Sequence, residues 1–299
     1  MNSVAIRGIA LENRVRILAI NSTSLIYNVT NKLETTAVAS AALGRSMSIT
    51  SLMGLMKKNE DQIFTTIDGK GALGAIHVHY MGHGKIRGYV DNPNVQTFIN
   101  DMNKLDVSRA VGTDGFLTVK YRQGLKADYL GSVPIQSGEI SQDYTYYFAS
   151  SEQTPSVVSA GVLVDSEEKV SSSGAIIIQL MPGYLEEDIV FIENHLNDIS
   201  NLSSKLEVEN DIERLIKNIF KDFEVLESKV IEYDCACSYE EMESKIMTLS
   251  LKDLIEIRDE DKMIEAVCPW CNEKYIFDEV ALNKMIDERV NKMVIRDEK

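Results

Sequence analysis

All four cysteines of the chain lie in two close pairs, Cys235 and Cys237 in "DCAC" and Cys268 and Cys271 in "CPWC". Each pair places two sulfur atoms on one tight turn of backbone. Two such turns brought together supply the four thiolates that Zn²⁺ binds in a tetrahedron. The spacing therefore predicts one Zn²⁺ per chain, held by these four cysteines.

The residues that follow each pair support a folded metal module. Ser238 and Glu241 have the spacing of a capping box, which predicts a helix that begins directly after the first pair. The stretch "NEKYIF" after the second pair is typical of a strand. We therefore expect each cysteine pair to be followed at once by regular structure.

A zinc site of this kind leaves three functions open. The zinc could be a static part of the fold. It could also be a switch, because disulfides Cys235–Cys237 and Cys268–Cys271 would remove all four ligands at once. A structural zinc is associated with about 10–16 kcal/mol of binding free energy, and a core of some 60 residues rarely supplies more than about 3–5 kcal/mol. Loss of the metal should therefore unfold the module.

The third function is that of a dithiol oxidoreductase, which "CPWC" suggests. Such enzymes place the C-x-x-C motif at the N-terminus of a helix, which lowers the pKa of the nucleophilic thiol. Here the motif leads into an expected strand, and four thiols on one metal are not available for turnover. No Ser/His/Asp or paired-carboxylate pattern stands out either, so we expect a protein that is not an enzyme.

A glycine-rich motif has the spacing of a dinucleotide site. Gly69, Gly71 and Gly74 match G-x-G-x-x-G, and Asp91 lies 20 residues after Gly71. A dinucleotide site needs a helix that begins at these glycines. The next residues, "AIHVHY", predict a strand, so the glycines are interpreted as a hairpin turn and no nucleotide cofactor is expected.

Histidines and methionines also have simpler interpretations. His77 and His79 lie two residues apart on one strand face, with His83 nearby, but no third and fourth metal ligand is evident, so we interpret them as ordinary strand residues. Most methionines fall at apolar helix positions and are expected in the core, for example Met47, Met53 and Met56.

Composition and charge indicate a globular protein with an acidic C-terminal part. Hydrophobic residues make up 44% of the 299 residues, and the net charge is −15. Residues 1–178 hold 16 basic and 16 acidic residues, so the whole excess lies in residues 179–299. An acidic region repels phosphate, and no nucleic-acid partner is expected. The charged first twenty residues and the lack of a long apolar run predict neither a signal peptide nor a membrane span. We therefore expect a cytoplasmic location.

The predicted fold class is α+β. We expect an N-terminal domain of antiparallel strands and helices over residues 1–180, an amphipathic helical linker over 181–230, and a small zinc-binding domain over 231–299. Within the first domain, "RVRILAINST" predicts a strand and "TTAVASAALGRSMSITSLMGLMKK" a buried helix. The small residues of "SEQTPSVVSAGVLV", with Pro155 near the start, predict a second helix.

The linker is expected to cover apolar surface. Its apolar residues recur every three or four positions and predict one amphipathic helix: Leu185, Ile189, Ile192, Leu196, Ile199, Leu202 and Leu206. "NDIERLIKNIFKDF" predicts a second helix. Neither segment is apolar enough to fold alone, so we expect both to dock on the N-terminal strands.

Long motifs resemble the heat-shock protein 33 (Hsp33) family of bacterial redox-regulated chaperones. They are "DCAC" with "CPWCNEKY", "AALGRSMSITSLMGLM", "IRGYVDNP", "KLDVSRAVG", "GFLTV", "SGEISQDYTYYFASSEQTPSVVSAGVLV" and "IIQLMPG", in the family's order over nearly the full chain. Cys235, Cys237, Cys268 and Cys271 stand where the family's zinc ligands stand. Ala236 and Pro269-Trp270, between the ligands, stand where the family varies, and they could change the oxidation rate.

The resemblance implies an ATP-independent holdase that is inactive when reduced and zinc-bound. Oxidation under unfolding conditions would form the two disulfides Cys235–Cys237 and Cys268–Cys271, release zinc and unfold the linker. The partners implied are unfolded or oxidatively damaged client proteins during heat and oxidative stress. A homodimer is implied for the active, oxidised form.

Overall fold

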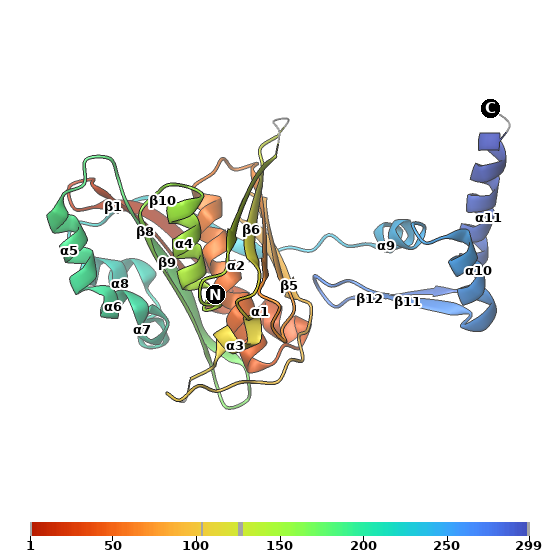
Figure 1. Ribbon diagram of the computed structural model, residues 1–299, viewed down its shortest axis with the longest axis horizontal. Coiled ribbons are helices and arrows are strands. Elements are labelled where there is room, and N and C mark those ends of the chain that lie inside the picture. Colours follow the sequence, from red (N-terminus) through yellow and green to blue (C-terminus); the bar gives the residue numbers. More distant parts are fainter. Residues whose placement is uncertain (1, 103, 125–127, 298–299) are drawn as a thin grey trace. The chain divides into compact units, whose positions relative to one another are not determined.

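The computed structural model describes residues 2–102, 104–124 and 128–297, with side chains described as far as Val290. The chain divides into two compact units, residues 1–234 and 235–299 (Figure 1). Residues 181–223, most of the expected linker, fold within the first unit. A strand, Glu224–Tyr233, crosses the expected boundary at residue 230 and also belongs to that unit.

The first unit is built on a ten-stranded sheet in the described residues. Its spatial order is β7-β6-β3-β4-β5-β10-β1-β2-β9-β8, and every described pairing is antiparallel except that of β10 with β5. The strands are β1 (Ser3–Ala10), β2 (Val15–Asn21), β3 (Gln62–Asp68), β4 (Ile76–Gly82), β5 (Lys85–Val90), β6 (Phe116–Arg122), β7 (Tyr129–Pro134), β8 (Ser156–Val164), β9 (Val170–Leu180) and β10 (Glu224–Tyr233).

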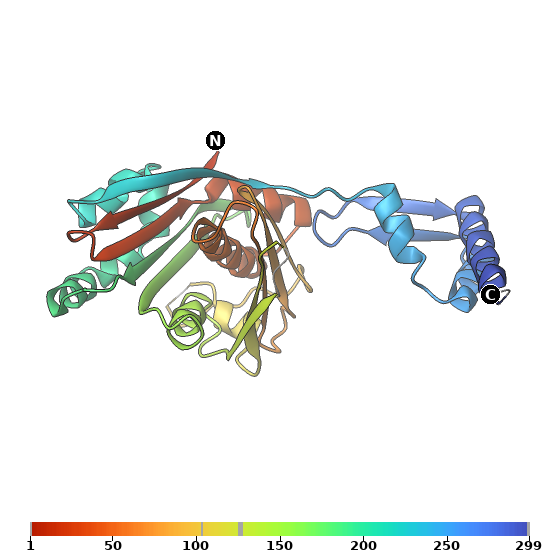
Figure 2. The same cartoon turned by 90° about the horizontal axis from the view of Figure 1, so that it is seen from above.

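Helix α2 (Ala37–Leu55) forms the centre of the first unit. All but one of its 19 residues are buried, which explains its wealth of Ala, Ser and Gly: small side chains let several neighbours approach the helix closely. Figure 2 shows the sheet bending around this helix. The predicted buried helix and the predicted strand at β2 are both confirmed, and Met47 and Met53 are fully buried in the core. Helices α1 (Thr23–Leu33) and α3 (Val107–Val111) lie beside α2.

The prediction of a helix over residues 151–164 is wrong. Residues Ser156–Val164 form β8, which pairs antiparallel with β9 along its whole length. The valines of this stretch favour a strand, and pairing with β9, which is also rich in β-branched residues, outweighs the signal of the small residues. The helix in this region lies earlier, as α4 (Ser141–Ser150), which packs against both outer strands, β7 and β8.

The expected linker helix over residues 185–206 is broken into three. They are α5 (Glu186–Asn194), α6 (Leu196–Ser200) and α7 (Leu202–Val208), with breaks at His195 and Asn201. The second expected helix is present as α8 (Ile212–Ile219). The breaks let Ile192, Ile199, Leu202 and Leu206 face a bent sheet, which one straight helix could follow only over part of its length. Leu185 and Leu196 of the predicted apolar stripe are instead exposed.

The second unit is small. It contains α9 (Tyr239–Ile246), α10 (Leu251–Glu260), a hairpin of β11 (Met263–Val267) and β12 (Lys274–Asp278), and α11 (Glu279–Asp297). Among its described side chains, besides two cysteines, seven apolar ones are buried: Met242, Ile246, Leu254, Phe277, Leu282, Met285 and Ile286. So small a core supplies little stability by itself.

Candidate metal centre

The four cysteine sulfurs converge on one point of the second unit. All four Sγ atoms lie within 4.8 Å of one another. The sulfurs of Cys235 and Cys268 are 3.8 Å apart, and those of Cys237 and Cys271 are 3.3 Å apart. A disulfide would require about 2.05 Å, so the four cysteines are thiols. Four ligands at about 2.3 Å from a central Zn²⁺ would be about 3.8 Å apart. The sulfur set therefore has the spacing of a tetrahedral metal site.

Local structure places each pair of sulfurs. The first pair follows the end of β10. The Ser238 hydroxyl accepts a hydrogen bond from the Glu241 N–H at the start of α9, so the predicted helix start and the Ser238 half of the capping box are confirmed. The second pair lies in the turn between β11 and β12, where the N–H groups of Cys271 and Asn272 donate to the Cys268 carbonyl at 3.3 and 2.8 Å. The predicted strand after this pair is confirmed as β12.

Burial and hydrogen bonding give the thiols different acidities. Cys268 and Cys271 are buried, with 0% and 3% of their surface exposed, and this burial raises the pKa of both thiols. Burial also acts on Cys237, but hydrogen bonds from Tyr275 and from the neighbouring cysteines outweigh it and lower its pKa. A cation at the centre of the four sulfurs would favour the thiolate form of each.

Tyr275 is a partner of this site that the sequence did not reveal. Its hydroxyl donates to the carbonyl oxygen of Cys237 at 3.1 Å and lies 3.2 Å from Cys237 Sγ. The bond to Cys237 raises the pKa of the phenol, so Tyr275 stays a donor at neutral pH. Tyr275 lies on β12 opposite Ala266, and no pattern in the sequence joins it to Cys237, 38 residues earlier.

The donor set fits a soft or borderline metal ion. Four sulfurs without a carboxylate suit Zn²⁺ rather than Mg²⁺ or Ca²⁺, which prefer oxygen ligands. A search of the described His, Cys, Asp and Glu side chains for groups close enough to hold a metal ion finds these four cysteines. The four predicted cysteines are thus together, close enough to hold one metal ion.

The other candidate residues lie in ordinary structural settings. The glycines Gly69–Gly74 connect β3 to β4 in an antiparallel hairpin, so the predicted turn is confirmed. His77 stacks on Tyr89 and lies 3.3 Å from Asp91, whereas His79 stacks on Phe64 and is 7% exposed. Burial, followed by the charges of Arg87 and Arg122, lowers the pKa of His79 to about 4.

The first unit also has an apolar sheet face that lies under the linker helices. We call it the covered face; its buried strand residues are Ile6, Ala10, Val15, Ile17, Ala19, Ile176 and Ile178. The linker packs ten buried apolar side chains against it: Ile192, Ile199, Leu202, Leu206, Ile212, Leu215, Ile216, Ile219, Phe220 and Phe223. The predicted docking of the linker on the N-terminal strands is confirmed. Without the linker, this face would be exposed apolar surface of the kind that binds other proteins.

An ion pair that the sequence analysis did not find also attaches the linker. Asp188, in the first turn of α5, is 2% exposed and accepts two hydrogen bonds from the Arg14 guanidinium, at 2.7 and 2.9 Å. Arg14 is the last residue of the turn before β2 and also donates to Glu12 at 2.7 Å. The bond from Arg14 holds the pKa of Asp188 below its usual range. The partners are 174 residues apart, so no local pattern could reveal the pair.

No helix in the described part of the chain is both long and apolar enough to cross a membrane.

Comparison with known proteins gives consistent matches over nearly the whole chain. Residues 3–278 match the family model of the Hsp33 protein. The chain is 40% identical to the 33 kDa chaperonin of Alkaliphilus oremlandii, over 98% of this chain and 99% of that protein. It is also 40% identical to the 33 kDa chaperonin of Oceanobacillus iheyensis, over 95% and 99%. The crystal structure of the Hsp33 homologue of Thermotoga maritima is similar at a TM-score of 0.88 and 30% identity, over 97% of this chain and 99% of that one.

Proposed function

This chain belongs to the Hsp33 family and is a chaperone, and from that premise we propose that it is an ATP-independent holdase controlled by the oxidation state of its cysteines. In the resting form, Cys235, Cys237, Cys268 and Cys271 hold one Zn²⁺ and the linker covers the sheet. In the active form, the cysteines are oxidised and the covered face binds unfolded or oxidatively damaged clients. The observation that carries this proposal is the convergence of four thiols within 4.8 Å in a unit with a small core.

The sulfur chemistry is a two-electron oxidation at each pair. One molecule of hydrogen peroxide takes two electrons from two thiolates, and with two protons it leaves as two molecules of water while one S–S bond forms. Two peroxides thus convert Cys235–Cys237 and Cys268–Cys271 into disulfides. Pairing within each motif closes the shortest loops, which costs the least entropy once the unit loosens.

Loss of the sulfur ligands is also loss of the fold in the second unit. Bound zinc supplies positive charge that keeps four thiolates together, at about 10–16 kcal/mol in comparable modules. The seven buried apolar residues offer about 3–5 kcal/mol at most. Oxidation therefore unfolds residues 235–299, and the chain that leaves β10 no longer enters a folded unit.

Release of the linker turns the change in the second unit into client binding. The linker must remain ordered to cover the sheet, and the conformational entropy lost on ordering costs about 1–2 kcal/mol per residue. This cost opposes the apolar burial that holds the linker on the sheet, so docking is easily reversed. Once it leaves, apolar side chains of both the sheet and the linker become available. Apolar burial needs no ATP, which suits a holdase.

We further propose a cytoplasmic protein that forms a homodimer when oxidised, and that is neither an enzyme nor a nucleic-acid binder. The reducing cytoplasm keeps thiols reduced until stress. The net charge of −15 opposes binding to phosphate.

The test is suppression of thermal aggregation of a client enzyme by reduced protein and by protein treated with peroxide at elevated temperature. We expect the client to be protected only by the treated protein. Mass spectrometry of that protein should find the disulfides Cys235–Cys237 and Cys268–Cys271. A static zinc module would keep its metal and stay inactive, and a dithiol oxidoreductase would catalyse reduction of insulin by a thiol. Either result would replace the proposal.

A further inference from the structure

Helix α7 rests on a part of β8 that has no side chain. Gly161 lies in the middle of β8, opposite Ser203 of α7. A Cβ atom at Gly161 would be 2.8 Å from Ser203 Cβ and closer still to Ser203 Oγ. Carbon atoms do not approach so closely, so α7 could not keep this position over any other residue.

The contact lies in the first turn of α7, among its buried residues. Ser203 is 7% exposed, and the Ser172 hydroxyl of β9 donates to the Ser203 carbonyl at 2.7 Å. On either side of Ser203, Leu202 and Leu206 are 2% and 3% exposed against the covered face. A shift of α7 at Ser203 would therefore also disturb the burial of both leucines.

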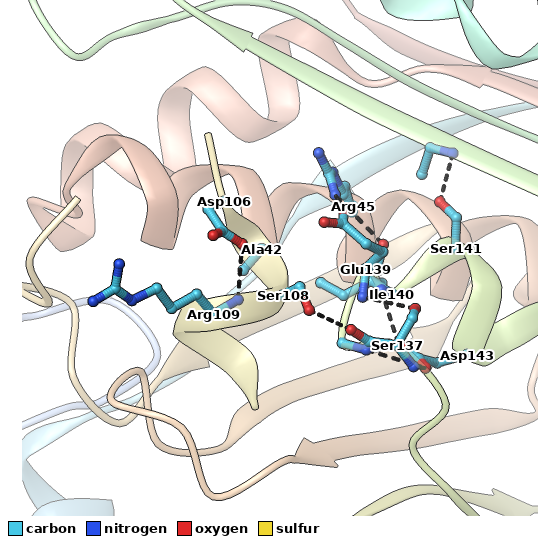
Figure 3. A network of polar contacts seen from close by, with 12 residues as sticks. Ala42, Arg45, Asp106, Ser108, Arg109, Ser137, Glu139, Ile140, Ser141 and Asp143 are labelled. Atoms are coloured by element: carbon cyan, nitrogen blue, oxygen red, sulfur yellow. Dashed lines mark hydrogen bonds and ion pairs between the residues drawn. The ribbon is translucent and has the colours of Figure 1, made fainter. Parts of the chain in front are cut away.

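Strand β8 cannot yield to relieve a clash. It pairs with β9 along its length, and the Ala160 N–H donates to the Ser141 hydroxyl of α4 at 3.0 Å; Figure 3 shows this bond. Helix α4 is itself fixed by Asp143, whose carboxylate accepts hydrogen bonds from the backbone N–H groups of Gln136, Ser137, Gly138 and Ile140 (Figure 3). On the other side, β8 is already tight against α2, since a Cβ at Gly44 would lie 2.8 Å from Val162 Cγ2.

We infer that Gly161 is a positioning residue that sets how firmly the linker docks: any side chain at this position displaces α7 while the cysteine site keeps its metal. The backbone of Gly161 is outside the left-handed region, so another residue fits the strand itself. Gly174 of β9 is less informative, because a Cβ there would contact Leu206 but also the Ile20 carbonyl, 2.8 Å away within the sheet. The consequence for chaperone activity rests on the proposed function.

The experiment is a size exchange between the two partners in the full-length, reduced, zinc-loaded protein. Gly161→Ala adds a methyl group, Ser203→Gly removes the opposing side chain, and the double variant restores the space. Ser204→Gly is the matched control, because Ser204 is exposed on the same helix and its change costs helix propensity without making room.

Hydrogen exchange of the α7 amides, followed by mass spectrometry, is the primary measurement. We expect exchange in Gly161→Ala to be at least about fivefold faster than in wild type, as overpacking costs imply. The double variant should return to the rate of Ser204→Gly, and thiol and zinc content should stay unchanged in all four. Unchanged α7 exchange in Gly161→Ala, or a double variant as fast as Gly161→Ala, would overturn the inference.

Chaperone activity separates this inference from the proposed function. Gly161→Ala should suppress client aggregation without any oxidant, and the double variant should not. If wild-type protein fails to protect clients after oxidation, the proposed function fails, while α7 exchange in the reduced variants still decides the role of Gly161.

Discussion

Phe220 offers a direct test of how the linker is held. The residue is the C-cap of α8, is 0% exposed, and belongs to the cluster that covers the sheet. Its ring centroid is 5.4 Å from that of Phe191 in α5, so it also joins two linker helices. Phe220→Ala removes this packing and leaves a cavity between the linker and the covered face.

The expected size follows from its complete burial. Replacement of a buried Phe by Ala costs about 3–5 kcal/mol, and each 1.4 kcal/mol changes an equilibrium about tenfold. The fraction of reduced molecules with an open linker should therefore rise by roughly 140- to 3700-fold. Val208→Ala is the matched control, because Val208 is an apolar linker residue that is 90% exposed.

Limited proteolysis with subtilisin measures this fraction, since cleavage tracks the open population when opening and closing are fast. Reduced, zinc-loaded Phe220→Ala should be cut within residues 184–223 far faster than wild type, and Val208→Ala should match wild type. Equal cleavage rates in Phe220→Ala and Val208→Ala would refute the conclusion that buried apolar side chains hold the linker.

Three further predictions concern single side chains. Tyr275→Phe removes the hydroxyl beside Cys237 Sγ. The affinity for zinc, measured by competition with a chelator, should fall about tenfold, as it does for other residues that support metal ligands. An unchanged affinity would count against that role. Asp188→Asn should loosen α5, seen as faster hydrogen exchange at pH 7. Arg14 lowers the pKa of Asp188, so the ion pair stabilises the fold fully above the ordinary aspartate pKa of about 4, and this stabilisation is lost as the pH falls through the lowered pKa. The exchange rates of wild type and variant should therefore converge in strong acid. A constant difference between them down to pH 1 would contradict this. His79 should titrate near its lowered pKa of about 4 by NMR. The pKa of histidine in the unfolded chain is near 6.5, so the contribution of His79 to stability falls as the pH drops from about 6.5 toward 4. A titration midpoint near 6.5 would show that burial affects His79 less than the structure indicates.

Local sequence patterns predicted the elements whose signals are local. The small residues of α2 and the alternation in β2 were sufficient for those elements, and the spacing of four cysteines was sufficient for their convergence. Ser238, the N-cap of α9, was predicted for the same reason, since a capping motif lies within four residues.

Elements that depend on distant partners were missed. β8 is a strand because it pairs with β9, and β10 is a strand because it pairs with β1 on one side and with β5 on the other. The bond between Arg14 and Asp188 and the contact of Tyr275 with Cys237 likewise join segments far apart in the sequence. The space that Gly161 leaves for Ser203 is visible only when both segments are in place.

The proposed function depends on four cysteines that bind one metal ion and release it when they are oxidised. Its most direct test follows released zinc and remaining thiols in the same sample during treatment with peroxide at elevated temperature. We expect one zinc ion to be released for every four thiols consumed, with both changes at the same rate. Purified protein without stoichiometric zinc, or protein that keeps its zinc after all four thiols are oxidised, would contradict it.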